Sequence, residues 1–323
     1  MNQPLVSVII PTYNYAHYIV DAINSVFTQD YPADKMEIVI VDDGSQDNTQ
    51  AVIEALGDDR IHFHYQQNAG KSAATAKAIE LARGKYLFNM DADDYYLPGK
   101  IRKTVEVFEA HPNVVHMGNP AKIIWEDSGR EKVEPIPEWM MNKVIKGSEL
   151  NTFFMENNML YGGGSTYAVR ASVIKPITIT ADINQYIDEY LIVSILPYGD
   201  TYLLSEPLTV WRVHGNNYSG KRKTKTELRK KEEQLLASSA GTLAQLKKLQ
   251  KLPESILKLY EFKHQMRTIS MKEKLGEKSF SDIFNFFTYF CFNNQQKRRV
   301  LQKYSAFNRL IPQSLLRLLK KVR

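Results

Sequence analysis

The sequence predicts an α/β fold with a mostly parallel central sheet, followed by a helical C-terminal region. Three observations predict it. Short apolar runs rich in β-branched residues alternate with helical patterns through the first half of the chain, polar clusters follow three of these runs, and the composition becomes basic after residue 220. Strands that alternate with helices of this length pair in parallel and carry helices on both faces of the sheet.

Strand and helix patterns follow one another in order through residues 6–117. The predicted strands are short apolar runs bounded by turn residues: Val6–Ile10 (stopped by Pro11), Ile38–Val41, Ile61–Tyr65, Tyr86–Met90 and Val114–Met117. The predicted helices between them have apolar residues at helical spacing: Ile19–Phe27, a helix capped by Asp47 that ends at Gly57, Ser72–Ala82 before Gly84, and a helix opened by Pro98 that runs through Phe108.

Ligands of parallel sheets bind beyond the carboxyl ends of the strands. Three polar clusters fall at such ends, namely Pro11–Asn14, Asp42–Ser45 and Asp91–Asp94. Residues 119–218 are less regular and end in the polar segment Trp211–Asn217. The sequence therefore predicts a ligand site at the edge of the sheet where the three clusters meet.

Composition and charge exclude several classes of protein. The 323 residues are 43% hydrophobic and 24% charged, which is ordinary for a globular chain. The single cysteine, Cys291, excludes an internal disulfide. The N-terminus lacks the pattern of a signal peptide, and no apolar stretch approaches the roughly 20 residues of a membrane span. We expect a cytoplasmic protein, or one bound peripherally to the inner face of the plasma membrane.

Asp91 and Asp93 stand two residues apart at a predicted strand end, where an extended backbone points both carboxylates the same way. Such a pair suits Mg²⁺ or Mn²⁺, which needs only one or two carboxylates when substrate phosphates complete its coordination. The alternative is a solvated acidic turn in which Asp94 caps a helix. The spacing alone leaves both open.

Two other clusters, each taken alone, also allow both a functional and a purely structural interpretation. The segment Asp42–Ser45 either presents a carboxylate to a base or ribose group or forms a plain Asx turn, and Tyr13 either stacks on a flat ligand or packs. The glycine run Gly162–Gly164 lacks the Lys-Ser/Thr ending and preceding strand of a P-loop, which excludes a phosphate cradle of that kind.

The order of these motifs resembles the N-terminal half of family 2 glycosyltransferases, which have the nucleotide-sugar-binding GT-A fold. The matching segments are Ser7–Asn14, Val39–Ser45, Asn68–Lys71 and Gly84–Asp94, and the resemblance resumes at Asp188-Glu189 and at Arg212-x-His214. It implies a GT-A domain over residues 1–220, with a nucleotide-binding half at about 1–118 and an acceptor half at about 119–220. Residues 221–323 form a basic helical region outside it.

The resemblance implies roles for the matching residues. Pro11, Tyr13 and Asp43 would contact the base, usually uracil in this family, and Lys71 would lie near the nucleotide. The Asp-x-Asp positions are occupied by Asp91, Ala92 and Asp93, which would bind the nucleotide sugar. Asp93 and Asp91 would hold the metal ion, Mn²⁺ or Mg²⁺, with His214 as a further ligand. Arg212 and His214 would belong to the loop that covers the donor.

The general base of the family is the second residue of a Glu-Asp pair, but this chain has the order Asp188-Glu189. Counting back from Gly199 puts Asp188 at the base position, and either carboxylate is chemically able to take the acceptor proton. The arginine usual six residues later is Ser194 here.

The resemblance implies an inverting, metal-dependent glycosyltransferase that moves a sugar from a nucleotide diphosphate, with UDP expected, to a hydroxyl of a glycan or lipid-linked acceptor in surface polysaccharide or glycoconjugate synthesis. A non-catalytic relative that binds a nucleotide sugar or a partner is the alternative. A sugar nucleotidyltransferase is disfavoured, because Pro11–Asn14 stands where its glycine-rich triphosphate loop would be.

The C-terminal third has a charge opposite to that of the rest. Residues 1–220 carry 17 Lys and Arg against 28 Asp and Glu, a net charge of −11, whereas residues 221–323 carry 25 against 8, a net charge of +17. The aromatic segment Phe284–Phe292 and the basic amphipathic segment Ser314–Lys321 lie in this region. It is interpreted as an anchor to an anionic membrane surface, as a module for homo-oligomer or partner contacts, or as a solvated appendage. No nucleic-acid motif accompanies the charge.

Overall fold

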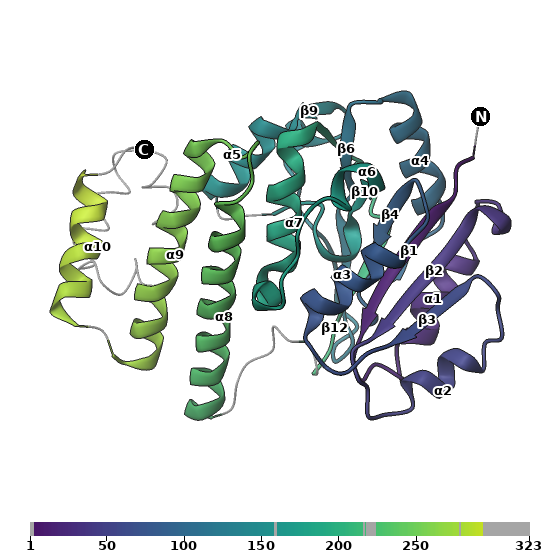
Figure 1. The fold of residues 1–323 in the computed structure, drawn as a ribbon, viewed down its shortest axis with the longest axis horizontal. Coiled ribbons are helices and arrows are strands. Elements are labelled where there is room, and N and C mark those ends of the chain that lie inside the picture. The colour runs from purple at the N-terminus through teal and green to yellow at the C-terminus, as the bar shows by residue number, and fades with distance from the viewer. Residues whose placement is uncertain (1–2, 158–159, 216, 218–223, 278, 293–323) are drawn as a thin grey trace. The chain divides into compact units, whose positions relative to one another are not determined.

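The structure is a computed structural model that describes residues 3–157, 160–215, 217, 224–277 and 279–292 (Figure 1). The chain forms two compact units. The N-terminal unit consists of Met1–Leu150 and Leu160–Gly220, and the C-terminal unit consists of Asn151–Met159 and Lys221–Arg323. Helix α5 (Gly147–Asn157) runs across the boundary at residue 150.

The N-terminal unit contains two sheets. The larger sheet has eight strands in the spatial order β3 (Ile61–Tyr65), β2 (Met36–Asp42), β1 (Val6–Thr12), β4 (Tyr86–Asn89), β10 (Ala168–Arg170), β6 (Val114–Gly118), β11 (Asp200–Leu203) and β9 (Val144–Lys146). The smaller sheet has the order β5 (Tyr95–Tyr96), β12 (Thr209–Val213), β7 (Ala121–Trp125) and β8 (Glu131–Val133).

The larger sheet is mixed but mostly parallel, which confirms the predicted fold class. Strands β3, β2, β1 and β4 pair in parallel, and β6 pairs in parallel with β11. The short strand β10 lies antiparallel between β4 and β6, and β9 is antiparallel to β11. The carboxyl ends of β1, β2 and β4 therefore lie side by side, as the sequence predicted.

Strand β1 continues through Pro11, although the sequence predicted that it would stop there. Pro11 pairs in register with Val41 of β2. Its nitrogen faces the β4 side, since the carbonyl of Ile9 accepts from Met90 on that side, and pairing with β4 ends at Ile9. The missing N–H of Pro11 therefore removes no hydrogen bond between β1 and β4.

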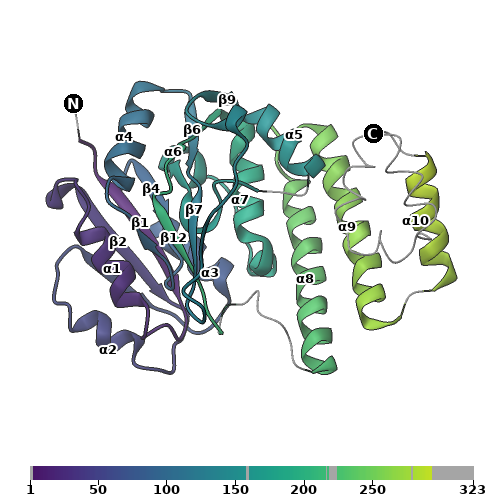
Figure 2. The same cartoon turned by 180° about the vertical axis from the view of Figure 1, so that it is seen from behind.

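Helices cover both faces of the sheet. The remaining helices of the N-terminal unit are α1 (Ile19–Phe27), α2 (Thr49–Glu54), α3 (Lys71–Leu81), α4 (Lys100–Ala110), α6 (Ala171–Ile174) and α7 (Ile187–Ile195). Val8, Ile38 and Phe88 of neighbouring strands pack in one core cluster with α1 and α4, whereas α3 lies against β1 and β2 on the opposite face (Figures 1 and 2).

Two predicted helix starts differ in detail. Helix α2 follows Asn48 rather than Asp47, although the Asp47 carboxylate still accepts from the amide of Thr49, the first residue of the helix, at 3.0 Å. Helix α4 follows Gly99, whose φ of 87° is left-handed, so Pro98 lies outside the helix.

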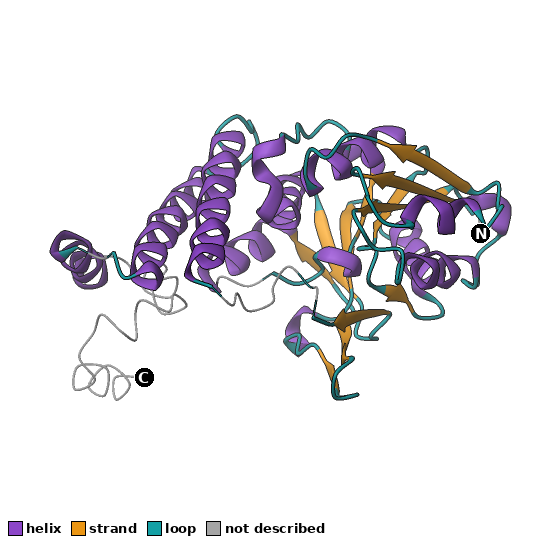
Figure 3. Cartoon of the chain, turned by 90° about the horizontal axis from the view of Figure 1, so that it is seen from below, coloured by secondary structure: helices purple, strands orange, loops and turns teal. Residues whose placement is uncertain are grey.

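The C-terminal unit contains only helices and connecting turns over its described residues (Figure 3). They are α8 (Lys225–Leu246), α9 (Glu254–Leu275) and α10 (Phe280–Phe292), besides residues 151–157 of α5. A capping box between Thr224 and Glu227 starts α8. The aromatic segment predicted at 284–292 falls in α10, and the amphipathic segment 314–321 lies outside the described residues. Among the described helices, none has the length and apolar character needed to cross a bilayer.

Candidate active site

The ends of β1 and β2 continue into two loops that bind each other. Asn14, with a left-handed φ of 58°, donates its amide to Ser45 Oγ at 2.8 Å and accepts from the amide of Gln46 at 2.7 Å. Tyr13 precedes it with a side chain that is 42% exposed, whereas Pro11 is buried within β1. This loop pair therefore presents an exposed aromatic ring at the edge of the sheet.

Asp43 is buried and holds the loop that leads into α3. Its carboxylate accepts hydrogen bonds from the side-chain amide of Gln66 and from the backbone amides of Ala69 and Gly70, each at 2.8 Å. In this structure Asp43 fixes the segment just before Lys71.

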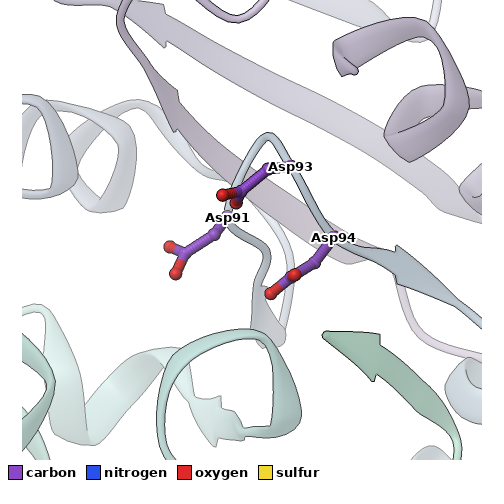
Figure 4. Close-up of side chains that lie close together, drawn as sticks. All are labelled: Asp91, Asp93 and Asp94. Carbon is purple, nitrogen blue, oxygen red and sulfur yellow. The ribbon is translucent and has the colours of Figure 1, made fainter. Parts of the chain in front are cut away.

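Residues Asp91–Asp94, called the acidic turn below, follow β4. The amide of Asp94 donates to the carbonyl of Asp91 at 3.0 Å. The segment is thus a turn, and the expectation of an extended backbone between Asp91 and Asp93 was wrong. The turn still gathers the carboxylates, because oxygens of Asp91, Asp93 and Asp94 lie within 4.8 Å of one another (Figure 4). The Ala92 methyl group is buried in the core cluster.

The segment after the glycine run lies directly against the acidic turn. The Ser165 hydroxyl accepts from the amide of Asp91 at 2.9 Å and donates to the Asp94 carboxylate, and the Asn89 side chain donates to the carbonyl of Gly164. Ser165 and Asp94 are both buried. Asp94 therefore has fixed partners inside the protein, and it does not cap α4.

The end of β12 closes the other side of the acidic turn. The Arg212 side chain donates to the carbonyl of Asp93 and forms an ion pair with Asp21 at 2.8 Å. His214 Nε2 lies 3.1 Å from Asp93 Oδ2, and the Asn217 side-chain amide donates to the same oxygen at 3.1 Å. The two predicted residues of this loop thus lie against the acidic turn.

Aromatic rings from the start of α1 pack over this strand end. The Tyr18 ring stacks on the His214 ring with centroids 4.5 Å apart, and the Arg212 guanidinium lies 4.7 Å from the Tyr18 ring. Burial and the carboxylate of Asp93 raise the pKa of the Tyr15 hydroxyl. Tyr15 and Tyr18 were not predicted from the sequence as site residues, and only their position just after the segment Ser7–Asn14 could have indicated them. Asp94 was named in the predicted ligand cluster, but no binding role was assigned to it.

Lys71 connects the acidic turn to α7. Its Nζ lies 2.8 Å from Asp91 Oδ1 and 3.7 Å from Asp188 Oδ2. Asp188 and the next residue, Glu189, occupy the first turn of α7, and both are half-buried. Residues about 100 positions apart in the chain are thereby brought together through one ammonium group.

The electrostatics of the site follow from burial and crowding. Burial raises the pKa values of Asp93 and Asp94. The neighbouring Asp91 carboxylate adds to both shifts, and the Asp93 carboxylate adds to that of Asp94. Burial raises the pKa of Asp188 in spite of the Lys71 charge. The donor set of the acidic turn fits a divalent cation, because hard carboxylate oxygens gather within reach of a single ion and its charge would offset their repulsion.

Comparisons with known proteins agree with this geometry. The family model described as Glycosyl transferase family 2 matches residues 7–175. The putative teichuronic acid biosynthesis glycosyltransferase TuaG of Bacillus subtilis is 41% identical over 107 residues, which cover 32% of this chain and 42% of that protein. Matches to three of the curated relatives span 42–66% of those proteins' own length.

Two solved structures share the fold at low sequence identity. S. aureus TarS 1–349 in complex with UDP has a TM-score of 0.61 at 16% identity, covering 94% of this chain and 90% of that chain. The mannosyltransferase PcManGT from Pyrobaculum calidifontis, in complex with GDP-Man and Mn²⁺, has a TM-score of 0.56 at 17% identity, covering 95% and 81%. The family match extends over half of the chain and includes the acidic turn, so this chain belongs to glycosyl transferase family 2.

Proposed function

We propose that the protein transfers a sugar from a nucleotide diphosphate, with UDP as the expected nucleotide, to an acceptor hydroxyl with inversion at the anomeric carbon. One observation carries the proposal beyond family membership. Lys71 contacts both Asp91 of the acidic turn and Asp188 of α7, so a candidate donor site and a candidate base share one cation. A transferase needs this proximity, because both substrates react at one carbon atom.

The donor side is assigned to the loops at the edge of the sheet. Tyr13 and Pro11 would border the base with Asp43, Lys71 would lie near the diphosphate, and Ala92 would line the acidic turn. Arg212 would act chiefly by holding the acidic turn, since its guanidinium already contacts Asp93 and Asp21.

Asp91, Asp93 and His214 would hold Mn²⁺ or Mg²⁺, with Asp94 fixing the turn behind them. When bound, such an ion offsets the negative charge that develops on the leaving diphosphate. The mannosyltransferase of the same fold forms a complex with Mn²⁺, which supports this assignment.

Asp188 is the proposed base. Burial raises the pKa of its carboxyl group, which makes the carboxylate a better proton acceptor. In the proposed step the acceptor oxygen bonds to the anomeric carbon while the bond to the diphosphate breaks, and the hydroxyl proton passes to Asp188. Because this is one displacement, the configuration at that carbon inverts.

The acceptor is proposed to be a growing surface polymer, either a glycan or a lipid-linked saccharide. The name of the Bacillus relative refers to teichuronic acid synthesis, and a UDP complex exists for the TarS neighbour. The acceptor half, at about residues 119–220, would supply the surface that recognises it.

The donor is tested by titrating UDP, GDP and CDP into the protein by calorimetry, each with and without Mn²⁺. We expect Mn²⁺-dependent binding of UDP that is lost in Asp93→Ala and kept in Asp34→Ala, a matched change at an exposed aspartate that pairs with Lys35. Preference for GDP would overturn the choice of UDP. Nucleotide binding without turnover on any acceptor would support the non-catalytic alternative.

The base and the stereochemistry are tested together. Asp188→Asn should lower kcat by at least about a hundredfold with little change in UDP affinity, and Glu189→Gln should have a much smaller effect. The reverse ranking would assign the base to Glu189. NMR of the product should show the inverted anomer, and a retained anomer contradicts the single displacement.

The basic C-terminal region is proposed to bring the enzyme to an anionic membrane surface, where lipid-linked acceptors are found. Its charge supports the proposal, since residues 221–323 carry a net charge of +17. Sedimentation with vesicles that contain anionic lipid should be salt-sensitive, and vesicles of zwitterionic lipid should not bind. Binding to neither, with a concentration-dependent molecular mass, would favour homo-oligomer formation instead.

A further inference from the structure

Lys71 is a cation held between carboxylates of two different elements. Its Nζ lies 2.8 Å from Asp91 Oδ1 and 3.7 Å from Asp188 Oδ2. Lys71 is the first residue of α3, and the next residue is also held, because the Asn184 side chain accepts from the amide of Ser72 at 3.1 Å. The ammonium group is therefore directed to this position by a fixed helix start.

The Asp91 oxygen that Lys71 contacts belongs to the donor set of the acidic turn. Oxygens of Asp91, Asp93 and Asp94 lie within 4.8 Å of one another, so their charges repel. Asp93 has partners in His214 and Asn217, and Asp94 has partners in Ser165 and Arg212. At Asp91 the compensating charge comes from Lys71.

A divalent ion bound by Asp91 would meet the ammonium group at close range. Mg²⁺ binds carboxylate oxygens at about 2.1 Å, whereas the ammonium nitrogen is 2.8 Å from the same oxygen. Two cations on one oxygen repel each other strongly in a half-buried site. The second carboxylate, that of Asp188, offers the ammonium group a place to remain.

We propose that Lys71 and the divalent ion compete for Asp91, and that the ammonium group withdraws to Asp188 when the ion binds. The inference rests on the metal site of the proposed function. Lys71 then acts as a positioning residue that couples the loading of the donor site to the orientation of the Asp188 carboxylate. A purely structural cross-link between the acidic turn and α7 is the alternative.

The two roles predict opposite changes in metal affinity. Under competition, Lys71→Met removes the rival cation, so Mn²⁺ without nucleotide should bind on the order of tenfold more tightly. Under a structural role, the same variant loosens Asp91 and weakens Mn²⁺ binding. Lys71→Arg keeps the charge and should bind Mn²⁺ like the wild type. Lys77→Met, which removes a lysine of the same helix paired with Glu80, is the matched control.

The measurement is calorimetric titration of Mn²⁺ into the full chain, checked by the loss of the free Mn²⁺ signal in EPR. If Lys71→Met binds Mn²⁺ no more tightly than Lys77→Met does, the competition is overturned while the metal site of the proposed function stands. If neither the wild type nor any variant binds Mn²⁺, even with UDP, the metal site of the proposed function is overturned and the competition with it.

A second measurement uses the wild-type sequence, in case Lys71→Met does not fold. Lysines are reductively methylated with ¹³C, and the Lys71 signal is identified by its loss in Lys71→Arg. Addition of Mg²⁺ should shift this signal and leave that of Lys77 in place. A Lys71 signal that does not move when Mg²⁺ binds overturns the proposal.

Discussion

At the scale of single residues, the Ser165 hydroxyl group makes two hydrogen bonds that close the acidic turn from behind. It accepts from the amide of Asp91 and donates to the carboxylate of Asp94, and the residue is fully buried. The hydroxyl group thus fixes both ends of the segment that gathers the proposed metal ligands.

Ser165→Ala should destabilise the protein by about 1–3 kcal/mol, because the amide of Asp91 loses its Ser165 acceptor and the buried Asp94 carboxylate loses one hydrogen bond and keeps that from the amide of Arg212. It should also weaken Mn²⁺ and UDP binding. Ser7→Ala is a matched control, since the Ser7 hydroxyl likewise accepts a backbone amide, that of Gly84, and donates to a carboxylate, that of Glu37. Ser7 lies at the opposite end of β1, so its loss should cost stability alone. Equal effects of both variants on Mn²⁺ binding, measured by calorimetry, would contradict the role of Ser165.

The residues of the site were predictable to different degrees. Six residues of the candidate site were named from the ordered motifs, and the structure gathers them around the acidic turn: Asp91, Asp93, Lys71, Asp188, Arg212 and His214. Ser165 and Asn184 were not assigned to this group, because neither stands in one of the matching motifs and no regular periodicity in residues 119–187 indicates which segment meets which. Their partners are set by tertiary packing, which local sequence does not encode.

At the scale of secondary-structure elements, segments with a clear apolar pattern bounded by turn residues were predictable, and the shortest elements were not. Strand β3 has the predicted bounds, and α1 covers the predicted residues. Strand β10 contains only three residues, which is too short for an alternation of apolar and polar residues to indicate a strand. It nevertheless lies antiparallel between β4 and β6. The acidic turn was misjudged for a related reason, since a four-residue segment has no period to read.

The start of α3 depends on the backbone conformation of one glycine. Gly70 has φ 95° and ψ 160°, a backbone region that is essentially restricted to glycine. A Cβ atom there would lie 2.9 Å from the Asn184 side chain, which accepts the hydrogen bond from Ser72. Strain and displacement of Asn184 would both be transmitted to Lys71.

Gly70→Ala should therefore lower the free energy of unfolding by about 2 kcal/mol or more and reduce transferase activity. Gly57→Ala is the control. Gly57 also has a positive φ, 58°, but its Cβ would meet nothing within 4 Å, so its cost should be about 1 kcal/mol with activity unchanged. Urea unfolding measures the free energy of unfolding of both variants, and activity assays measure their transferase activity. An active Gly70→Ala would show that the α3 start tolerates movement.

At the scale of the whole molecule, the division into units sets what an unfolding experiment reports. The chain forms two compact units, and chains of more than one unit depart from a single two-state unfolding transition. All three tryptophans, Trp125, Trp139 and Trp211, belong to the N-terminal unit. Tryptophan fluorescence therefore follows the unfolding of the unit that carries the candidate site.

Lys100 makes the stability of that unit depend on pH. Its Nζ is buried between Asn119 Oδ1 and the carbonyl of Thr166, and burial lowers the pKa of Lys100 to about 7. In the unfolded chain the same amine titrates near 10.5. Between these two values the unfolded state binds about one more proton than the folded state. The free energy of unfolding should therefore rise with pH in this window, by up to about 1.4 kcal/mol per pH unit.

Urea titrations followed by tryptophan fluorescence at several values between about pH 7.5 and 9.5 measure this slope. Lys100→Met should unfold more easily than the wild type at the upper end of this range, because two buried acceptors lose their donor. Its free energy of unfolding should rise with pH less steeply than that of the wild type, by about 1.4 kcal/mol per pH unit, because the proton uptake of Lys100 is gone. Lys77→Met, at a surface lysine, should keep the wild-type slope. The difference in slope is the diagnostic quantity, since a loss of stability alone would follow from any core substitution. A slope unchanged in Lys100→Met would mean that Lys100 remains protonated in the folded protein.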